Sequence, residues 1–252
     1  MTARKHIRGQ VRATAVLIAC AVLGVPLVGL GDETGDARKP VFEDRFETDL
    51  SNWQAEGPHE VKLRGGKLHV RTSWAKEPKD RSGQFVWLKR ELPADFRVEY
   101  DVTPLSASGF FLIFFCARGA EGEDILGEKL FKQYTELRDF EKYTVGPVNC
   151  YHISYRRNEV ADCNLRKNTG KHLVSTSRLD AVLPRGRSAH VVLTKVGGHI
   201  TLVVDGRTFM DWTDDGSLNG GVYGAGKLGL RQVYESEGLY DNFRVTDLTP
   251  QP

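Results

Sequence analysis

One stretch of the sequence, residues 150–168, concentrates side chains that bind sugars and acids. Polar and apolar residues alternate on both sides of residues 157–159, as in two antiparallel strands joined by a tight turn. A three-residue turn with Arg156 opposite Val160 places His152 opposite Asn164. One face then carries His152, Ser154, Arg156, Asp162, Asn164 and Arg166, and the other carries Tyr151, Ile153, Tyr155, Ala161, Cys163 and Leu165. This hairpin is predicted to have one core face and one face rich in hydrogen-bonding groups.

The polar face has the residue types that bind an acidic sugar. Arginine binds a carboxylate through two parallel hydrogen bonds, and asparagine binds hydroxyl groups. We predict substrate-binding roles for Arg156, Asn164, Arg166 and Ser154. His152 is the predicted general base of a polysaccharide lyase, because its reference pKa is near neutrality, and Tyr155 is a weaker candidate acid. The alternative is a solvated strand face in which arginine pairs with Asp162.

A long segment before the hairpin, residues 118–148, interrupts the strand pattern and is typical of a lid or binding loop. Arg118 and Asp124 lie near its start, where a short helix is predicted over 123–131. Arg118 is a candidate ligand contact. Asp124 is a candidate acid or ligand anchor, with capping of the predicted helix as the alternative.

Two further residues are candidate ligand contacts. The polar face of the hairpin, with His152, is expected to line a concave groove. Arg231 follows a glycine-rich loop and is predicted to join this groove, with a surface position on an edge strand as the alternative. Trp74 follows a strand among polar residues and is the predicted platform for a sugar ring.

Several other chemistries lack their sequence patterns. Paired carboxylates of a retaining glycosidase would need a triplet such as Glu-x-Asp-x-Glu, and the nearest stretch, 235–237, lies in a predicted turn. No nucleophile elbow, phosphate loop, nucleotide fingerprint or zinc spacing occurs. No cofactor is expected apart from a structural calcium ion as an alternative, for which the candidate ligands are Asp44, Asp205, Asp214, Asp215 and Asp241.

Composition narrows the class of partner. The chain has 252 residues, 40% of them hydrophobic, which is enough for one good core. Its net charge is +2, with both signs spread along the chain. A nucleic-acid-binding protein would concentrate Lys and Arg, so nucleic acid is not an expected partner. The polar face of the hairpin makes a glycan or polysaccharide the expected partner.

The N-terminus is typical of export. Basic residues from Arg4 to Arg12 precede an apolar run over 13–30, and residues 29–31 offer a small-x-small cleavage site. Residues 1–31 are predicted to be a signal peptide, with an uncleaved membrane anchor or lipidation of Cys20 as alternatives. Each alternative predicts a periplasmic, extracellular or envelope-anchored protein that contacts membrane only through this segment or its lipid. Residues 32–40 are the expected linker and 41–248 the folded domain.

The remaining chain predicts an all-β fold. Short alternating strands recur with glycine-rich turns between them, as in an antiparallel two-sheet sandwich. Residues 109–116 are apolar on both faces, which predicts a central strand covered on both sides. Cys150 and Cys163 point to opposite faces of the hairpin, so no disulfide is expected between them.

Longer motifs give a family resemblance. Phe42-x-Asp-x-Phe46, Val204-Asp-Gly206 and Tyr240-Asp-Asn-Phe-x-Val245 resemble concanavalin A-like jelly rolls. Tyr151-His-Ile-Ser-Tyr155, Cys163-Asn-Leu-Arg-Lys-Asn168, Lys195-x-Gly-Gly198 and Gly229-Leu-Arg-Gln232 resemble the YesU-like bacterial family, a domain of unknown function. The resemblance implies a lectin- and glucanase-like jelly roll with a concave face and a link to polysaccharide use, as an enzyme or as a non-catalytic or structural envelope module. It implies no established catalytic residues.

Overall fold

The computed structural model describes residues 38–73, 83–127, 130–132, 136–137, 139–157, 162–178 and 183–250. The predicted signal segment, Trp74 and the hairpin turn at 158–161 lie outside these residues, so their predictions stay untested. Within the described residues no helix is long and apolar enough to cross a membrane.

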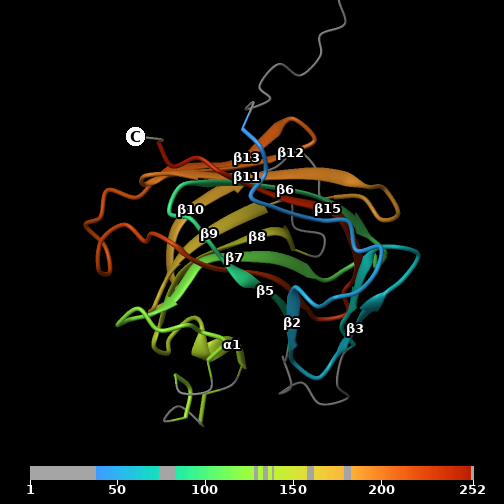
Figure 1. The fold of residues 1–252 in the computed structure, drawn as a ribbon, viewed down its shortest axis with the longest axis horizontal. Helices are drawn as coiled ribbons and strands as arrows, with labels where there is room; N and C mark the ends of the chain where they lie inside the picture. Colours follow the sequence, from blue (N-terminus) through green and yellow to red (C-terminus); the bar gives the residue numbers. More distant parts are fainter. Residues whose placement is uncertain are drawn as a thin grey trace, which may run out of the picture. The chain divides into compact units, whose positions relative to one another are not determined.

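Two antiparallel sheets make up this part of the chain (Figure 1). The eight-stranded sheet has the order β13-β12-β11-β6-β15-β4-β3, with β1 also paired to β15, and the seven-stranded sheet has the order β10-β9-β8-β7-β14-β5-β2. The strands are β1 Phe42–Asp44, β2 Trp53–Glu56, β3 Glu60–Leu63, β4 Leu68–Arg71, β5 Gln84–Leu92, β6 Phe96–Pro104, β7 Phe110–Gly119, β8 Val148–Arg157, β9 Asp162–Asn168, β10 His172–Arg178, β11 Ala189–Val196, β12 His199–Val204, β13 Arg207–Thr213, β14 Gly226–Val233 and β15 Glu237–Asp247. The predicted all-β jelly-roll sandwich is confirmed.

The main core lies between the two sheets and follows the alternation of side chains along each strand. In β6, for example, every second residue from Phe96 to Pro104 is buried. The β7 strand has buried side chains on both faces: Phe111, Ile113 and Phe115 belong to the main core, while Leu112 and Phe114 belong to a second cluster. This confirms the predicted central strand.

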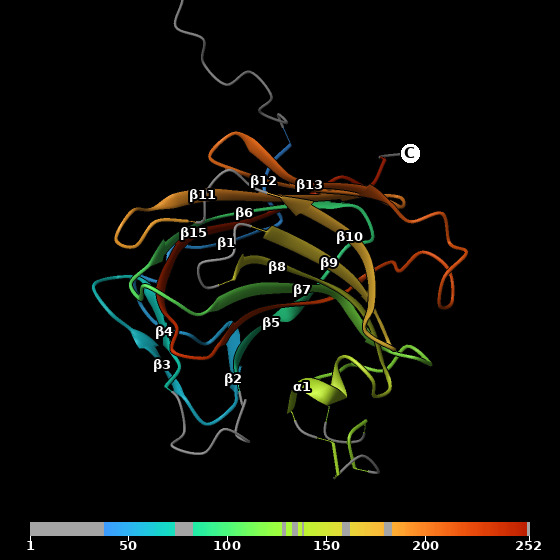
Figure 2. The ribbon, with the colours of Figure 1, turned by 180° about the vertical axis from the view of Figure 1, so that it is seen from behind.

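The second apolar cluster lies on the other face of the seven-stranded sheet, beneath the long segment between β7 and β8. Figures 1 and 2 show this sheet curving around the side on which helix α1, Asp139–Lys142, lies. Residues 124–127 form a turn, and the helix of this segment begins at Asp139 rather than at the predicted residue 123. The predicted lid is packed on the sheet because Ile125, Leu130 and Tyr143 bury their side chains there.

The predicted hairpin forms, but its register differs from the prediction by two residues. His152 pairs with Arg166, Ser154 with Asn164 and Cys150 with Asn168. The turn is therefore longer than three residues. A shift of two leaves the side chains of the paired residues, 150–154 and 164–168, on their predicted faces, because the faces of a strand alternate with a period of two.

All three cysteines in the described residues are free and buried. Cys150 and Cys163 form no disulfide, as predicted. Cys163 packs in the main core, and Cys150 lies in the second cluster on the opposite face.

Candidate functional site

Two neighbouring rows of side chains cross the curved face of the seven-stranded sheet. Strand pairing fixes both rows. The first row is Trp87, Gly229, Phe114, His152 and Arg166. The second row is Phe85, Arg231, Leu112, Ser154, Asn164 and Thr176. Five residues predicted from the sequence to bind or act on a ligand thus share one face, with aromatic residues toward β5 and polar residues toward β10.

A glycine makes the aromatic end of the first row possible. A Cβ atom at Gly229 would lie 2.5 Å from the ring of Trp87, so any larger residue would displace that ring. Trp87 stacks on Phe85 with a centroid distance of 5.0 Å, and its Nε1 donates a hydrogen bond of 3.0 Å to Glu56. Tyr143 donates its hydroxyl to the same carboxylate and ties the long segment to the sheet.

His152 lies under the long segment rather than in an open hollow. Its side chain stacks on Phe114, with ring centroids 4.6 Å apart, and it makes an edge-to-face contact with Phe140 from α1, with ring centroids 6.1 Å apart. Only 3% of His152 is exposed. The expectation that His152 projects into an open groove is therefore wrong, because α1 packs over it.

The hydrogen bonds of Cys150 and Asn168 define the tautomer of His152. Burial raises the pKa of the Cys150 thiol to about 12, so the thiol keeps its proton and donates to Tyr143 O at 3.3 Å. The sulfur then accepts a hydrogen bond from Asn168 Nδ2, and the same amide donates to His152 Nδ1 at 2.9 Å. The proton of the neutral imidazole therefore resides on Nε2, which makes His152 a hydrogen-bond donor at that nitrogen.

Charge also disfavours His152 as a base. Burial lowers the pKa of His152 well below its usual range, and the positive charges of Arg166, Arg231 and Lys171 lower it further. A weakly basic imidazole with Nε2 already protonated is suited to binding an acceptor group, such as a carboxylate or a sugar hydroxyl. The arrangement therefore supports a ligand-binding role better than general-base catalysis.

We expect the His152 ring to stay neutral through pH 6.5 in the folded protein, because cationic imidazole is disfavoured there. The unfolded chain takes up this proton near pH 6.5, so the stability that depends on neutral His152 is present above that pH and decreases as the pH falls. An NMR titration of the His152 Cε1–H signal checks this. A His152 midpoint at or above 6.5 would contradict it.

Arg231 is the most deeply buried cation of the two rows, with 4% of the residue exposed. Its guanidinium group lies over Phe85 at 5.0 Å and over Phe140 at 4.3 Å. A Cβ atom at Gly83 would lie 2.6 Å from Arg231 Nη2, so the backbone there also fixes the guanidinium. Arg231 thus occupies an inner strand of the sheet and not an edge, in contrast to the alternative considered from the sequence.

The β9–β10 end of the site is more open. Arg166 is partly exposed and donates from Nη1 to Lys171 O at 2.9 Å, and the ammonium group of Lys171 lies 5.1 Å from the ring centroid of Phe140. Asn164 is partly exposed and accepts a hydrogen bond from Thr176, while Ser154 is buried beside it. These side chains form the accessible margin of the candidate site.

Arg156 does not take part in the site, contrary to its predicted substrate-binding role. A β-bulge between Phe111 and Leu112 breaks the alternation of faces, and the Arg156 guanidinium lies over Phe111, a residue of the main core. Its nitrogens donate to five backbone carbonyls, those of Ser106, Ala107, Ser108, Gly109 and Leu183. Five N–H groups are all that a guanidinium has, so none remains for a ligand.

The remaining predicted residues lie elsewhere on the fold. Arg118 pairs with Glu91 at the far end of β7, and Asp124 forms an ion pair of 3.3 Å with Lys227. Asp124 also accepts a hydrogen bond of 2.9 Å from Leu126 N, as a turn former does. Neither lies in the two rows. Tyr155 is buried in the main core, where its hydroxyl meets Tyr100 OH at 3.1 Å, and burial raises its pKa well above the usual range.

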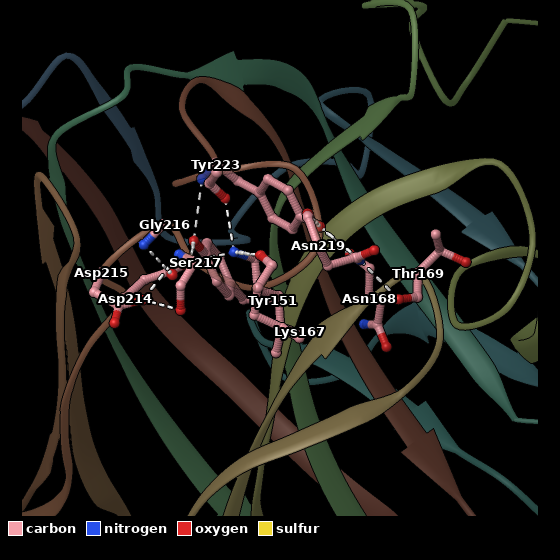
Figure 3. Close-up of polar contacts among 12 residues, drawn as sticks. Tyr151, Lys167, Asn168, Thr169, Asp214, Asp215, Gly216, Ser217, Asn219 and Tyr223 are labelled. Carbon is pink, nitrogen blue, oxygen red and sulfur yellow. Dashed lines mark hydrogen bonds and ion pairs between the residues drawn. The ribbon is translucent and has the colours of Figure 1, made fainter.

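A second polar network holds the turn that carries Lys171 (Figure 3). Lys167 and Asp214 form a buried ion pair of 2.7 Å, and Tyr151 donates its hydroxyl to the same carboxylate. Lys167 also donates to the carbonyl oxygens of Leu218 and Gly221 in the glycine-rich loop. The loop is therefore fixed against β8 and β9.

The glycine-rich loop in turn supports the β9–β10 turn. Asn219 Nδ2 donates to Thr169 O at 2.8 Å, and Tyr223 donates its hydroxyl to Asn168 O at 2.6 Å (Figure 3). Gly170 N donates to Thr144 O in the long segment at 2.7 Å. Residues 169–171 are thus held between two loops, which places Lys171 at the margin of the site.

The sequence analysis missed Phe140, Lys171 and the buried pair of Lys167 and Asp214. A signal was present for Lys167, because a lysine at a core-facing strand position needs a buried partner. Phe140 and Lys171 come from a loop and a turn, where no periodicity indicates which way a side chain points. No group of three or more His, Cys, Asp or Glu side chains in the described residues is arranged to hold a metal ion, and calcium binding stays a prediction.

Comparisons with known proteins agree with this fold. The chain is 28% identical over 209 residues to the uncharacterized protein YesU of Bacillus subtilis (strain 168), covering 80% of this chain and 91% of YesU. A Bacillus subtilis protein of unknown function with a galectin-like fold superposes with a TM-score of 0.70 at 25% identity, covering 83% of this chain and 97% of that one. The carbohydrate binding module CBM66 from Bacillus subtilis has a TM-score of 0.51 at 15% identity, covering 78% and 96%.

The family match extends over most of the chain. Residues 41–245 match the model of a family described as "Domain of unknown function (DUF1961)". That range begins one residue before β1 and ends within β15, so it takes in both sheets and both rows of the candidate site. This chain belongs to the DUF1961 family, has the YesU protein as a relative, and folds as a concanavalin A-like jelly roll.

Proposed function

We propose that this protein binds a carbohydrate that contains acidic sugars, on the curved face of the seven-stranded sheet. The observation that carries the proposal is the meeting of aromatic and cationic side chains there. Phe114, His152 and Phe140 lie together, and Arg231 and Lys171 both contact Phe140. Aromatic faces stack on sugar rings, and arginine binds carboxylates through paired hydrogen bonds.

Fold likeness supports the proposal only in part. A carbohydrate-binding module shares the sandwich, but at 15% identity it supplies no residue roles. Sugar binding is therefore inferred from the side chains of the site itself. The polar margin with Asn164 and Arg166 offers an amide and a guanidinium beside the aromatic rows, and such mixed apolar and polar linings are typical of ligand sites.

Binding is the favoured activity over catalysis. A lyase needs a base whose pKa is near neutrality, placed beside the carbon from which it removes a proton. His152 has a depressed pKa and a protonated Nε2. The alternative is a polysaccharide lyase or glycosidase-like enzyme. An unsaturated product that absorbs in the ultraviolet after incubation with a polyuronate would favour the lyase.

We further propose that the protein acts outside the cytoplasm, in the periplasm, in the medium or attached to the envelope. The basic and apolar character of residues 1–31 supports export. Mass spectrometry of the protein recovered from a bacterial host distinguishes a cleaved signal from a retained or lipidated segment. A full-length, unmodified chain in the cytoplasmic fraction would contradict export.

In a panel of uronate oligosaccharides and their neutral counterparts, we expect the protein to bind at least one uronate and to prefer it over the neutral sugar. Arg166→Ala should weaken that binding about tenfold, since a hydrogen bond to a charged group contributes about 1.5–3 kcal/mol and Arg166 is partly exposed. Isothermal titration calorimetry measures both.

The matched control is Arg187→Ala. Arg187 is exposed, precedes β11 of the eight-stranded sheet and pairs with Asp205. This substitution should leave the affinity unchanged. Equal binding of the neutral sugars, or equal losses in both variants, would count against an acidic-sugar site on this face.

A further inference from the structure

Phe140 lies at the centre of the candidate site and is contacted from several sides. The Arg231 guanidinium is 4.3 Å from its ring centroid, the Lys171 ammonium is 5.1 Å away, and the His152 ring is 6.1 Å away. These three residues come from β14, the β9–β10 turn and β8, and Phe140 comes from α1. One partly buried aromatic ring therefore occupies the point where three hydrogen-bond donors converge.

We propose that Phe140 is an internal occupant of a carboxylate-binding subsite, and that a sugar ring bearing a carboxylate displaces it. This inference rests on the proposed function and specifies the ligand class and the route by which the ligand enters. Arg231 would bind the carboxylate at the base of the subsite, with Lys171 and the Nε2–H of His152 beside it. The exposed Arg166 and Asn164 would then contact the next sugar along the chain.

The chemistry of the three donors favours a carboxylate over a phenyl ring. A phenyl ring offers cations only its π face, whereas a carboxylate accepts two parallel hydrogen bonds from a guanidinium. A carboxylate or hydroxyl would also accept a hydrogen bond from the Nε2–H of His152, which a phenyl ring does not accept in the same way. A pyranose ring has roughly the same breadth as a phenyl ring, so it fits the space from which Phe140 departs.

The segment that carries Phe140 is anchored after it, at Tyr143 and Thr144. Tyr143 donates its hydroxyl to Glu56 and its carbonyl accepts from Cys150, while Thr144 O accepts from Gly170 N. Helix α1 has only four residues, and a helix this short has little stability of its own. A rotation of the Phe140 side chain, or of α1 about the 143–144 anchor, would lift the ring while Tyr143 keeps its hydrogen bonds to Glu56 and Cys150.

Displacement has a measurable consequence for affinity. If only a fraction of molecules has the ring out of the subsite, the apparent dissociation constant is the intrinsic one divided by that fraction. The cation–π contacts that hold the ring are of ordinary size, so Phe140→Ala should tighten uronate binding about five- to thirtyfold. A residue that instead stacks on the bound sugar would show the opposite change.

The matched control is Phe131→Ala, from the same long segment. Phe131 packs edge-on to Tyr143 at 5.5 Å and lies under Lys142, apart from the three donors. Its replacement should leave uronate affinity within about twofold. Phe140→Leu keeps apolar volume without the π face and should give an intermediate affinity, which guards against a fold defect in the alanine variant.

The experiment is calorimetry of wild type and the three variants with the uronate oligosaccharides of the panel, followed by hydrogen exchange of residues 139–146. Tighter binding by Phe140→Ala, and faster exchange of 139–146 in wild type when the uronate is added, are the expected results. Unchanged or weaker binding by Phe140→Ala, or slower exchange, overturns the displacement while leaving acidic-sugar binding in place. Absence of uronate binding by wild type and by every variant overturns both proposals.

Discussion

Replacing Arg156 with methionine is expected to reduce the free energy of unfolding by about 4 kcal/mol, and to do so without any direct effect on a ligand. The substitution removes five hydrogen bonds from a guanidinium group that is 1% exposed. It also removes a donor from the carbonyl groups of Leu183 and of residues 106–109, and a buried carbonyl that loses its donor costs about 1–3 kcal/mol. Urea denaturation followed by tryptophan fluorescence measures the change.

Two controls identify the cause of this loss. Arg156→Lys keeps the charge but supplies three donors from a single nitrogen in place of five, so it should recover only part of the stability. Arg187→Met removes an arginine that is exposed and should change the unfolding free energy by less than about 0.5 kcal/mol. If Arg156→Met were as stable as wild type, the loop at 106–109 would have to be held by other contacts.

The second large effect is expected at the buried ion pair below the glycine-rich loop. Lys167→Met leaves the Asp214 carboxylate without its cation in a site where both side chains are almost fully buried. Removing one partner of a buried pair costs about 3–5 kcal/mol. The loss should also loosen residues 214–224, because Lys167 donates to two carbonyl groups of that loop. Thermal unfolding and hydrogen exchange of the loop measure these two effects.

The double variant Lys167→Met with Asp214→Leu is the test that separates the pair from its parts. Replacement of both partners by apolar residues removes the uncompensated charge, so the double variant should be more stable than Lys167→Met alone. Additive losses would show that the two side chains contribute independently, in conflict with the 2.7 Å contact between them.

The ion pair also predicts how stability depends on pH. Hydrogen bonds from Lys167, Tyr151 and Gly216 lower the pKa of Asp214, although burial alone would raise it. Because the folded pKa is depressed below the unfolded value of about 3.9, the stabilisation is present above that value and is lost as the pH falls through the folded pKa. In Asp214→Asn, stability should therefore change less with pH below about 4 than in wild type.

The two networks separate the roles of neighbouring residues in the family motifs. Along β8 and β9, Tyr151 and Lys167 face the main core and fix the glycine-rich loop, while His152 and Arg166 face the opposite side and line the candidate site. Alternation along a strand therefore assigns half of the motif to stability and half to the ligand. Substitutions of the first pair should destabilise the fold, and those of the second pair should change binding.

The sequence by itself determined the jelly-roll class, the central strand at 109–116 and the face on which the paired hairpin residues 150–154 and 164–168 lie. These features follow from the alternation of apolar residues along strands, which is a local property and survives a shift of register by two. The exported location and the acidic-sugar ligand stay predictions from the sequence, with the site geometry in support of the ligand.

Only the tertiary structure decided which of the polar residues on that face are available to a ligand. A bulge turned Arg156 toward the main core, where backbone carbonyls surround it, and α1 covered His152 with Phe140. Both outcomes depend on contacts between residues far apart in the sequence, and no strand period encodes such contacts. The position of Lys171 likewise depends on two loops that meet only in the folded chain.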